Sequence, residues 1–278
     1  MRKILSIITI IVLVFTYIPT SAIAAEVIPN NESGIPDKYL YQAILKELGK
    51  NSDETFTKEE AARITNLEAI NSSYKMKHKR IKRLKGIGYL KNLKYLDISS
   101  NNISKLNGIE NLNELTYLNI SDNWLKSIVG IDNLKKLTVL DISFNKLTAL
   151  DGIGELINLT NLSVTSNKIT SIKEVKDLTN LEQLSVNNNK LENLEGIESL
   201  IKLNLLRASS NYLKFINEVK NLSNLIELSI SKNQIKSLAG IENLKKLQSL
   251  MASDNKLKTL PDLTAFTELM DEYTYFQY

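Results

Sequence analysis

The chain has 278 residues, 43% hydrophobic and 24% charged, and its 35 basic and 31 acidic residues give a formal net charge of +4. This ordinary globular composition argues against a chain that is disordered throughout or collagen-like. Because the sequence has no cysteine and a single histidine, His78, it excludes disulfides, a cysteine nucleophile, thiolate zinc sites and multi-histidine metal centres.

Residues 1–25 are predicted to form a secretory signal peptide. A basic start at Arg2 and Lys3 precedes an apolar run over residues 4–18, and Ala-Ile-Ala at 22–24 provides the small residues that a signal peptidase recognises. The apolar run is shorter than the ~20 residues of a membrane-spanning helix. We therefore expect cleavage near residue 25, a secreted protein, and no stable membrane span afterwards. The alternative is an uncleaved anchor.

Residues 26–73 are predicted to form a small helical N-terminal cap. A first helix is indicated by apolar residues at helical spacing: Leu40, Ile44 and Leu48. A capping-box pattern over residues 57–60 opens a second short helix that is expected to run through Ile64. The loop between the two helices lacks the alternating ligands and central glycine of an EF-hand, so we expect no calcium site there.

After the cap, one pattern repeats every 22 residues. Its most regular feature is an asparagine that recurs eight times at this spacing: Asn101, Asn123, Asn145, Asn167, Asn189, Asn211, Asn233 and Asn255. Leucines stand five and eight residues before each asparagine, and the unit reads L-x-x-L-x-[IVA]-x-x-N-x-[IL]-x-x-[LI]. This is the leucine-rich-repeat pattern.

The pattern predicts an α/β fold, a leucine-rich-repeat solenoid (horseshoe) with a parallel β-sheet on its concave face. A short strand over 95–99 sends Leu96 and Ile98 inward and leaves positions 95, 97 and 99 outside, because strand side chains alternate. Stacked copies then bury the inward residues in one continuous core. We interpret the asparagines as structural, since an inward amide can satisfy backbone groups that a tight bend leaves unpaired.

The repeats are predicted to span residues 74–267, as one degenerate copy followed by the eight regular ones, with a C-terminal tail over 268–278. In the degenerate copy Lys79 stands where the asparagine is expected. By this register, Lys75 and Lys77 flank an inward Met76 on the first strand of the sheet.

A glycine column suggests a tight turn in most copies. Its members are Gly108, Gly130, Gly152, Gly196 and Gly240. Glu174 and Glu218 replace glycine in two copies, so a left-handed backbone is not obligatory at this position.

The order of these segments resembles the internalins. The residues that carry the resemblance are the signal peptide, a short cap with Ile35-Pro36-Asp37 and Leu48-Gly49-Lys50, and repeats such as GIENLNELTYLNISDNWLKSI at 108–128. The resemblance covers roughly residues 35–267. Internalins are secreted or surface leucine-rich-repeat proteins of Gram-positive bacteria, and several bind host proteins. The resemblance therefore implies a host-interaction or virulence role.

The chain departs from the familiar internalin layout after its repeats. It shows no immunoglobulin-like module, no LPxTG-type sorting tail and no wall-binding modules. We expect a short, released member, loosely associated with the cell surface at most, or a fragment of a longer protein. Cytosolic phosphatase-regulating repeat proteins carry nearly the same 22-residue unit, and the signal peptide argues against that group.

Aromatic residues stand out on the predicted sheet, whose outward columns are rich in small hydroxyls. Tyr95 and Tyr117 share one column in adjacent copies, Val139 continues it, and Trp124 and Phe144 lie near its loop edge. Exposed aromatic side chains on a rigid sheet are typical anchors of protein interfaces, so we predict that these residues bind a partner. The alternative is that a tyrosine pair simply favours strands.

A second, weaker cluster is predicted further along the sheet. It contains Leu205, Arg207, Ile226 and Met251.

A basic strip marks the junction of cap and repeats. Residues 75–85 hold seven lysines and arginines and no acid. Its candidate anion contacts are Lys75, Lys77, Lys79 and Arg80, for a sulfated glycan, a teichoic acid, an acidic lipid or an acidic protein. The alternative is a solvated edge that the acidic cap partly neutralises.

Two functions follow from these features. The first is an extracellular binding or adhesion module that grips a host or envelope macromolecule, above all a protein, on its concave sheet. The second is a structural or assembly protein of the bacterial envelope that binds wall polyanions through the basic strip. We expect no enzyme, because carboxylates such as Asp97 and Asp141 lie two copies apart with no pocket-forming domain beside them. We also expect no cofactor, no metal and no nucleic-acid partner.

Overall fold

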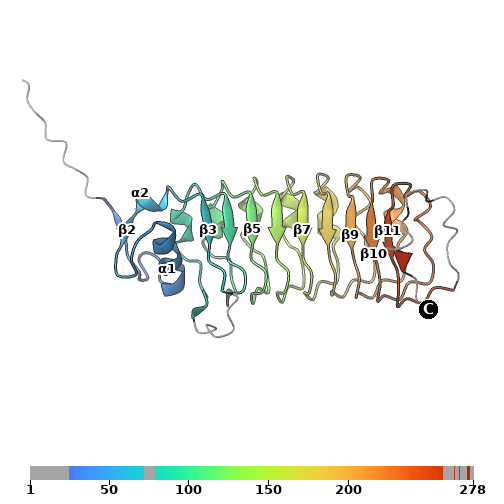
Figure 1. Ribbon diagram of the computed structural model, residues 1–278, viewed down its shortest axis with the longest axis horizontal. Helices are drawn as coiled ribbons and strands as arrows, with labels where there is room; N and C mark the ends of the chain where they lie inside the picture. Colours follow the sequence, from blue (N-terminus) through green and yellow to red (C-terminus); the bar gives the residue numbers. More distant parts are fainter. Residues whose placement is uncertain (1–24, 72–78, 259–265, 267–268, 270–273, 276–278) are drawn as a thin grey trace, which may run out of the picture.

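The computed structural model describes residues 25–71, 79–258, 266, 269 and 274–275, and they form a small cap followed by an elongated stack of repeats (Figure 1). Residues 1–24, which hold most of the predicted signal peptide, lie outside the described residues. So do Lys75, Met76 and Lys77 of the predicted degenerate copy.

One parallel sheet runs the length of the stack. In the described chain it contains ten strands in the order β12-β11-β10-β9-β8-β7-β6-β5-β4-β3, so each strand pairs with its neighbours in the sequence. The strands are β3 (Asn66–Glu68), β4 (Tyr95–Asp97), β5 (Tyr117–Asn119), β6 (Val139–Asp141), β7 (Asn161–Ser163), β8 (Gln183–Ser185), β9 (Leu205–Arg207), β10 (Glu227–Ser229), β11 (Ser249–Met251) and β12 (Thr274–Tyr275). Figure 1 shows them side by side along the long axis.

The repeat spacing fixes the strand register. Leu96 pairs with Leu118 and Leu118 with Leu140, one copy after another. Each of these leucines is at most 1% exposed. A fully buried leucine contributes about 1.5–3 kcal/mol relative to an exposed one. Because a single copy has no second layer to cover its leucines, this stabilisation exists only when copies stack.

Short 3₁₀ helices form the opposite side of the stack. They are η2 (Ile87–Tyr89), η3 (Ile109–Asn111), η4 (Ile131–Asn133), η5 (Ile153–Glu155), η6 (Lys173–Asp177) and η7 (Asn217–Asn221). In η2 to η5 a left-handed glycine precedes a three-residue helix. Where Glu174 and Glu218 replace that glycine, the helix starts two residues earlier in the repeat and runs for five residues, and neither glutamate has a positive φ.

The cap contains the two predicted helices and a small sheet that the sequence did not reveal. Helix α1 (Lys38–Glu47) buries Leu40 and Ile44, and Asp37 caps its start. Helix α2 (Lys58–Ala61) has the predicted capping box but ends at Ala61, short of the predicted Ile64. Strands β1 (Val27–Ile28) and β2 (Phe56–Thr57) pair antiparallel. Their buried Ile28 and Phe56 make strand pairing favourable in segments too short to show a periodicity.

The first strand of the parallel sheet lies earlier than the repeat register predicted. Strand β3 (Asn66–Glu68) pairs with β4, and its Leu67 lies opposite Leu96, whereas the segment around Met76 lies outside the described residues. Leu67 is fully buried, so it fills the inward position opposite Leu96 that the 22-residue register assigned to residue 74. The 22-residue spacing fails here because the chain between β3 and the next inward residue, Ile81, is longer than in a regular copy.

None of the helices in the described part of the chain has the length and apolar character needed to span a bilayer.

Candidate functional site

The outward side chains of strands β4 to β11 form a flat polar surface, which we call the sheet face. Asp97 accepts hydrogen bonds from the Ser99 N–H and from the Asn119 side-chain amide, both at 2.9 Å. Asp97 and Ser99 are only 6% and 8% exposed, although the alternation of side chains predicted them to lie outside. They do point outward, but strands about 4.8 Å apart pack small polar side chains of adjacent copies against one another.

Tyr95 and Tyr117 stack on this face. Their ring centroids are 4.2 Å apart and their planes differ by 7°. The stack forms because β4 and β5 pair with these two residues directly opposite each other. Both side chains are partly exposed. An aromatic pair adds about 0.5–1.5 kcal/mol beyond area burial, so the pair stabilises the sheet and also presents a rigid aromatic surface.

The environment of the pair keeps Tyr117 neutral. Burial is the largest cause and acts together with the adjacent Tyr95 hydroxyl and the carboxylates of Asp97 and Asp141 to raise the pKa of Tyr117 to about 12. An ionised phenolate would lose hydration and face like charge. Tyr117 therefore keeps its hydroxyl proton to a higher pH than an ordinary tyrosine does.

Phe144 is the third aromatic residue at this end of the sheet, just beyond β6. It is 59% exposed and has a left-handed backbone, with φ 54°. All eight residues of its column are left-handed, and the other seven are small or polar: Ser100, Asp122, Ser166, Asn188, Ser210, Lys232 and Asp254. A bulky side chain in this conformation is unfavourable and packs against little, so the repeat does not require Phe144.

Val139 and Trp124 differ in how they relate to the tyrosine stack. Val139 pairs with Tyr117 in the adjacent strand and continues the apolar column. Trp124 makes no ring contact with the tyrosines among the described residues. It is 52% exposed and lies past the bend, where Lys146 Nζ is 4.9 Å from its ring centroid. The predicted aromatic set is therefore a stacked pair with two separate exposed rings.

The second predicted cluster is built around an ion pair. Arg207 Nε lies 2.7 Å from Glu227 Oε1, and Arg207 Nη2 lies 3.2 Å from Glu227 Oε2. Ile226 is 40% exposed, and Leu205 and Met251 are partly exposed. Arg207 thus already has a carboxylate partner, so this cluster offers less free charge than the sequence suggested.

The asparagine column links consecutive copies through the backbone. Asn145 Oδ1 accepts a hydrogen bond from Leu125 N at 2.9 Å. Its Nδ2 donates to the carbonyls of Ile120, Ile142 and Ser143 at 3.0–3.1 Å. The same arrangement recurs from Asn101 to Asn255. These amides satisfy the hydrogen-bonding needs of backbone groups at each bend. The asparagine column is therefore structural.

Of the four candidate anion contacts predicted in the basic strip, Lys79 and Arg80 lie in the described chain. Lys79 is exposed and Arg80 is partly buried. Arg80 lines a cavity of about 610 Å³ together with Lys82, Trp124 and the start of α1. The sequence did not indicate this neighbourhood, because these residues are far apart along the chain.

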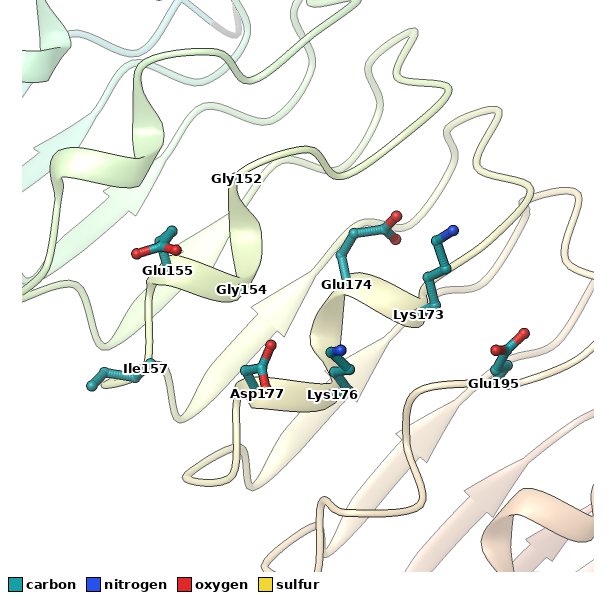
Figure 2. A pocket seen from close by; sticks show the side chains of 9 residues that line it. All are labelled: Gly152, Gly154, Glu155, Ile157, Lys173, Glu174, Lys176, Asp177 and Glu195. Atoms are coloured by element: carbon teal, nitrogen blue, oxygen red, sulfur yellow. The ribbon is translucent and has the colours of Figure 1, made fainter.

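A larger cavity of about 720 Å³ lies on the side of the 3₁₀ helices (Figure 2). Figure 2 shows Lys173, Glu174, Lys176 and Asp177 on η6, with Glu195 on the following copy. Four carboxylates and two lysines line it, so its charge is mixed with an acidic excess. Within the described ranges, no three histidine, aspartate or glutamate side chains gather closely enough to hold a metal ion.

Sequence reasoning missed two features of the site. The left-handed column was not recognised, although its enrichment in Ser, Asp and Asn is the signal for such a backbone. The cavity beside Arg80 had no local signal at all.

Comparisons with known proteins agree with the repeat architecture. A family model described as a leucine-rich repeat region matches residues 57–208, and a model of two leucine-rich repeats matches residues 223–265. No curated protein matches the chain.

Several solved structures are similar to this chain. Internalin C2 from Listeria monocytogenes is 33% identical, with 80% of this chain and 96% of that chain covered and a TM-score of 0.74. The functional domain of InlJ from Listeria monocytogenes is 29% identical, with 88% and 51% covered and a TM-score of 0.78, so the chain spans about half of that protein. The plant peptide hormone receptor RGFR1, solved in complex with RGF2, is 28% identical, with 69% and 33% covered and a TM-score of 0.61.

Proposed function

This chain belongs to the internalin-like leucine-rich-repeat proteins, and on that basis we propose that it is an extracellular module that binds a host protein on its sheet face. The proposed contacts are Tyr95, Tyr117, Val139 and Phe144. The cluster of Leu205, Ile226 and Met251 around Arg207 forms a secondary contact.

The observation that carries this proposal is the aromatic surface at one end of a flat polar sheet. Tyr95 and Tyr117 are locked in a stack, and Phe144 is exposed in an unfavourable backbone conformation. Rigid aromatic side chains lose little conformational entropy on binding and are enriched among interface hot spots. The surrounding hydrogen-bonded serines and carboxylates supply a polar rim of the kind that borders such anchors.

Similar proteins support a binding role. RGFR1 was solved in complex with RGF2, which shows that this repeat architecture can hold a peptide ligand in that receptor. Leucine-rich-repeat scaffolds of the internalin type are typically non-enzymatic. A host-interaction role in the virulence of a Gram-positive bacterium follows as part of the proposal.

The proposal requires export. A secreted protein, loosely associated with the cell surface at most, fits the predicted signal peptide. N-terminal sequencing of the exported protein should find Ala25 or Glu26 first, and a sequence that begins at Met1 would contradict cleavage.

The test measures binding of labelled protein to host cells. Replacing both tyrosines (Tyr95→Ala with Tyr117→Ala) should weaken binding by about 2 kcal/mol, or about 30-fold in Kd, the scale of interface hot spots. Phe144→Ser should also weaken binding, while it relieves the backbone and does not reduce the melting temperature. Treating the cells with protease should abolish binding, because the proposed partner is a protein.

A matched control uses the two residues that follow Val139 in the tyrosine column. Asn161→Ala with Gln183→Ala changes the same positions in β7 and β8 and should leave binding within about twofold of the unaltered protein. If the tyrosine variant folds normally and binds as well as this control, the partner does not use the aromatic surface.

A further inference from the structure

A cavity at the junction of cap and repeats has features of a ligand site, and we call it the junction pocket. It has a volume of about 610 Å³, within the range of small-molecule sites. Its walls come from the start of α1, from the segment that holds Arg80 and Lys82, and from Asn102 and Trp124 of the first two regular copies. Three parts of the chain must therefore fold together to form it.

Asp37 holds these walls in place. Its Oδ1 accepts hydrogen bonds from Tyr39 N and Leu40 N at the start of α1, at 3.0 and 3.2 Å. Its Oδ2 accepts from Lys82 N and Arg83 N at 2.8 and 3.0 Å. Asp37 is 7% exposed. Asp37 is the single carboxylate among the described lining residues, and both of its oxygens accept backbone hydrogen bonds. Because these bonds connect α1 to the segment of Lys82 and Arg83, the pocket is preformed.

The remaining charges of the junction pocket are positive. Arg83 pairs with Glu32 at 2.7 Å outside it. Among the described residues, Lys38, Arg80 and Lys82 have no ion-pair partner. Arg80 Nε is buried and has no hydrogen-bond partner among the described residues. A buried guanidinium N–H without a partner is costly, and no described carboxylate neutralises Arg80, so its charge favours an anion in the pocket.

Trp124 supplies an aromatic wall that the repeat does not require. Its column is otherwise polar in the neighbouring copies, with Asn102 before it and Lys146 after it. Lys146 Nζ lies over the ring at 4.9 Å from the centroid, and Trp124 also lines the junction pocket with Asn102. A flat ring beside several cations can stack on the apolar face of a sugar while the cations bind its charged substituents.

The geometry points to an anionic sugar as the ligand of the junction pocket. A sulfate or phosphate ester group binds Arg80 and Lys82, and the sugar ring packs against Trp124. Two sources carry this chemistry, a sulfated host glycan and a phosphate-bearing bacterial wall polymer. This site is separate from the sheet face and does not depend on the proposed protein partner.

Trp124 is the only tryptophan in the chain, so its fluorescence reports directly on the pocket. The protein is titrated with a heparin-derived tetrasaccharide and, in a second arm, with a sugar-phosphate oligomer. A saturable change in emission is expected in at least one arm, and the responding arm identifies the source. Two control ligands are used. The desulfated tetrasaccharide keeps the sugar but lacks the ester group, and a tetraglutamate peptide keeps negative charge but lacks the sugar.

Paired variants separate a defined pocket from diffuse charge. Arg80→Gln with Lys82→Gln should weaken binding by about tenfold or more, because the charge-assisted hydrogen bonds are lost. Lys168→Gln with Lys190→Gln removes the same charge from exposed positions of the Trp124 column and should change binding by about twofold at most. In calorimetry, Trp124→Ala should weaken binding and Trp124→Tyr should retain most of it. Thermal melts verify that every variant is folded.

Three results would overturn the inference. They are no emission change with either anionic sugar, equal binding of tetraglutamate, or equal losses in the two paired variants. The Tyr95→Ala and Tyr117→Ala variant should bind the sugars normally, and the Arg80→Gln and Lys82→Gln variant should still bind the host protein. The failure of one proposal is therefore distinguishable from the failure of the other.

Discussion

The backbone conformation of Phe144 and the aromatic stacking of Tyr117 are features that the repeat pattern does not require at their positions. Phe144 places a large exposed side chain on a left-handed backbone where other copies have Ser, Asp, Asn or Lys. Tyr117 shares its burial and its stack with Tyr95 and lies near Asp97 and Asp141. At the scale of single residues, the sheet face is thus unusual at one end, where its side chains are both rigid and exposed.

The raised pKa of Tyr117 leads to a prediction for alkaline pH. In a spectrophotometric titration, the difference between the protein and its Tyr117→Phe variant should show one phenol that ionises near pH 12. Tyr95→Phe should lower this value, because it removes the neighbouring hydroxyl. An unfolded tyrosine ionises at about 10. The unfolded state therefore loses this proton first, and the contribution of Tyr117 to the unfolding free energy declines as pH rises from about 10 to 12.

The unfolding free energies of the protein and of Tyr117→Phe are measured with denaturant at several pH values. The variant should lack the decline that is due to Tyr117, so it controls for the other titrating groups. If Tyr117 ionises with the bulk of the tyrosines, the stack is open to water and the aromatic surface is less rigid than described.

At the scale of elements, the glycine column shows how one copy constrains the next. Gly152 has φ 87°, and an added Cβ would meet Asp132 Cβ at an ordinary 3.5 Å. Gly196 has φ 109°, and an added Cβ would lie 2.7 Å from Lys173 Cα. At Gly196 the close neighbour is the backbone of Lys173, the first residue of the five-residue helix η6 in the preceding copy.

Two alanine variants test this coupling. Gly152→Ala should cost about 1–2 kcal/mol, the penalty of a left-handed alanine. Gly196→Ala should cost at least about 1 kcal/mol more, because backbone must also move to admit the methyl group. Urea unfolding of both variants measures the difference. Equal costs would mean that η6 yields easily and that adjacent copies are only loosely coupled.

At the scale of the whole molecule, the stack behaves as a line of neighbours. Asn145 and Asn255 make the same set of hydrogen bonds to the preceding copy and to their own bend. Asn145 is 9% exposed and lies between regular copies, whereas Asn255 belongs to the last one. In such a fold, the cost of a local defect depends on whether the stack can open beside it.

We predict that Asn145→Ala destabilises the protein by about 1–3 kcal/mol, the cost of leaving buried backbone groups unpaired. Asn255→Ala should cost less, because the last regular copy is followed in the described sheet by the two-residue strand β12 alone, so this end can open without disturbing the other copies. Asn113→Ala, at an exposed position, should stay within about 0.5 kcal/mol of the unaltered protein. Denaturant unfolding of the three variants gives this order, and a negligible effect at Asn145 would contradict the role of the column.

The repeat unit was sufficient to predict the solenoid, the strand register from Tyr95 onward and the inward leucines, because each copy forms contacts with a neighbour at a constant distance in the sequence. The same regularity misplaced the first strand. No periodic signal marks the longer chain between Leu67 and Ile81, and only the fit of Leu67 against Leu96 decides which segment joins the sheet. The small cap sheet of β1 and β2 depends likewise on contacts between segments far apart in the sequence.

The two proposed sites differ in the same way in how far the sequence predicts them. Tyr95 and Tyr117 are recognisable as neighbours because they share a column. Arg80, Lys82, Asp37 and Trp124 share no periodicity, and they meet only because the cap folds back onto the first copies. Local spacing determines contacts within a periodic stack. Contacts between the stack and its cap depend on the packing of the complete fold.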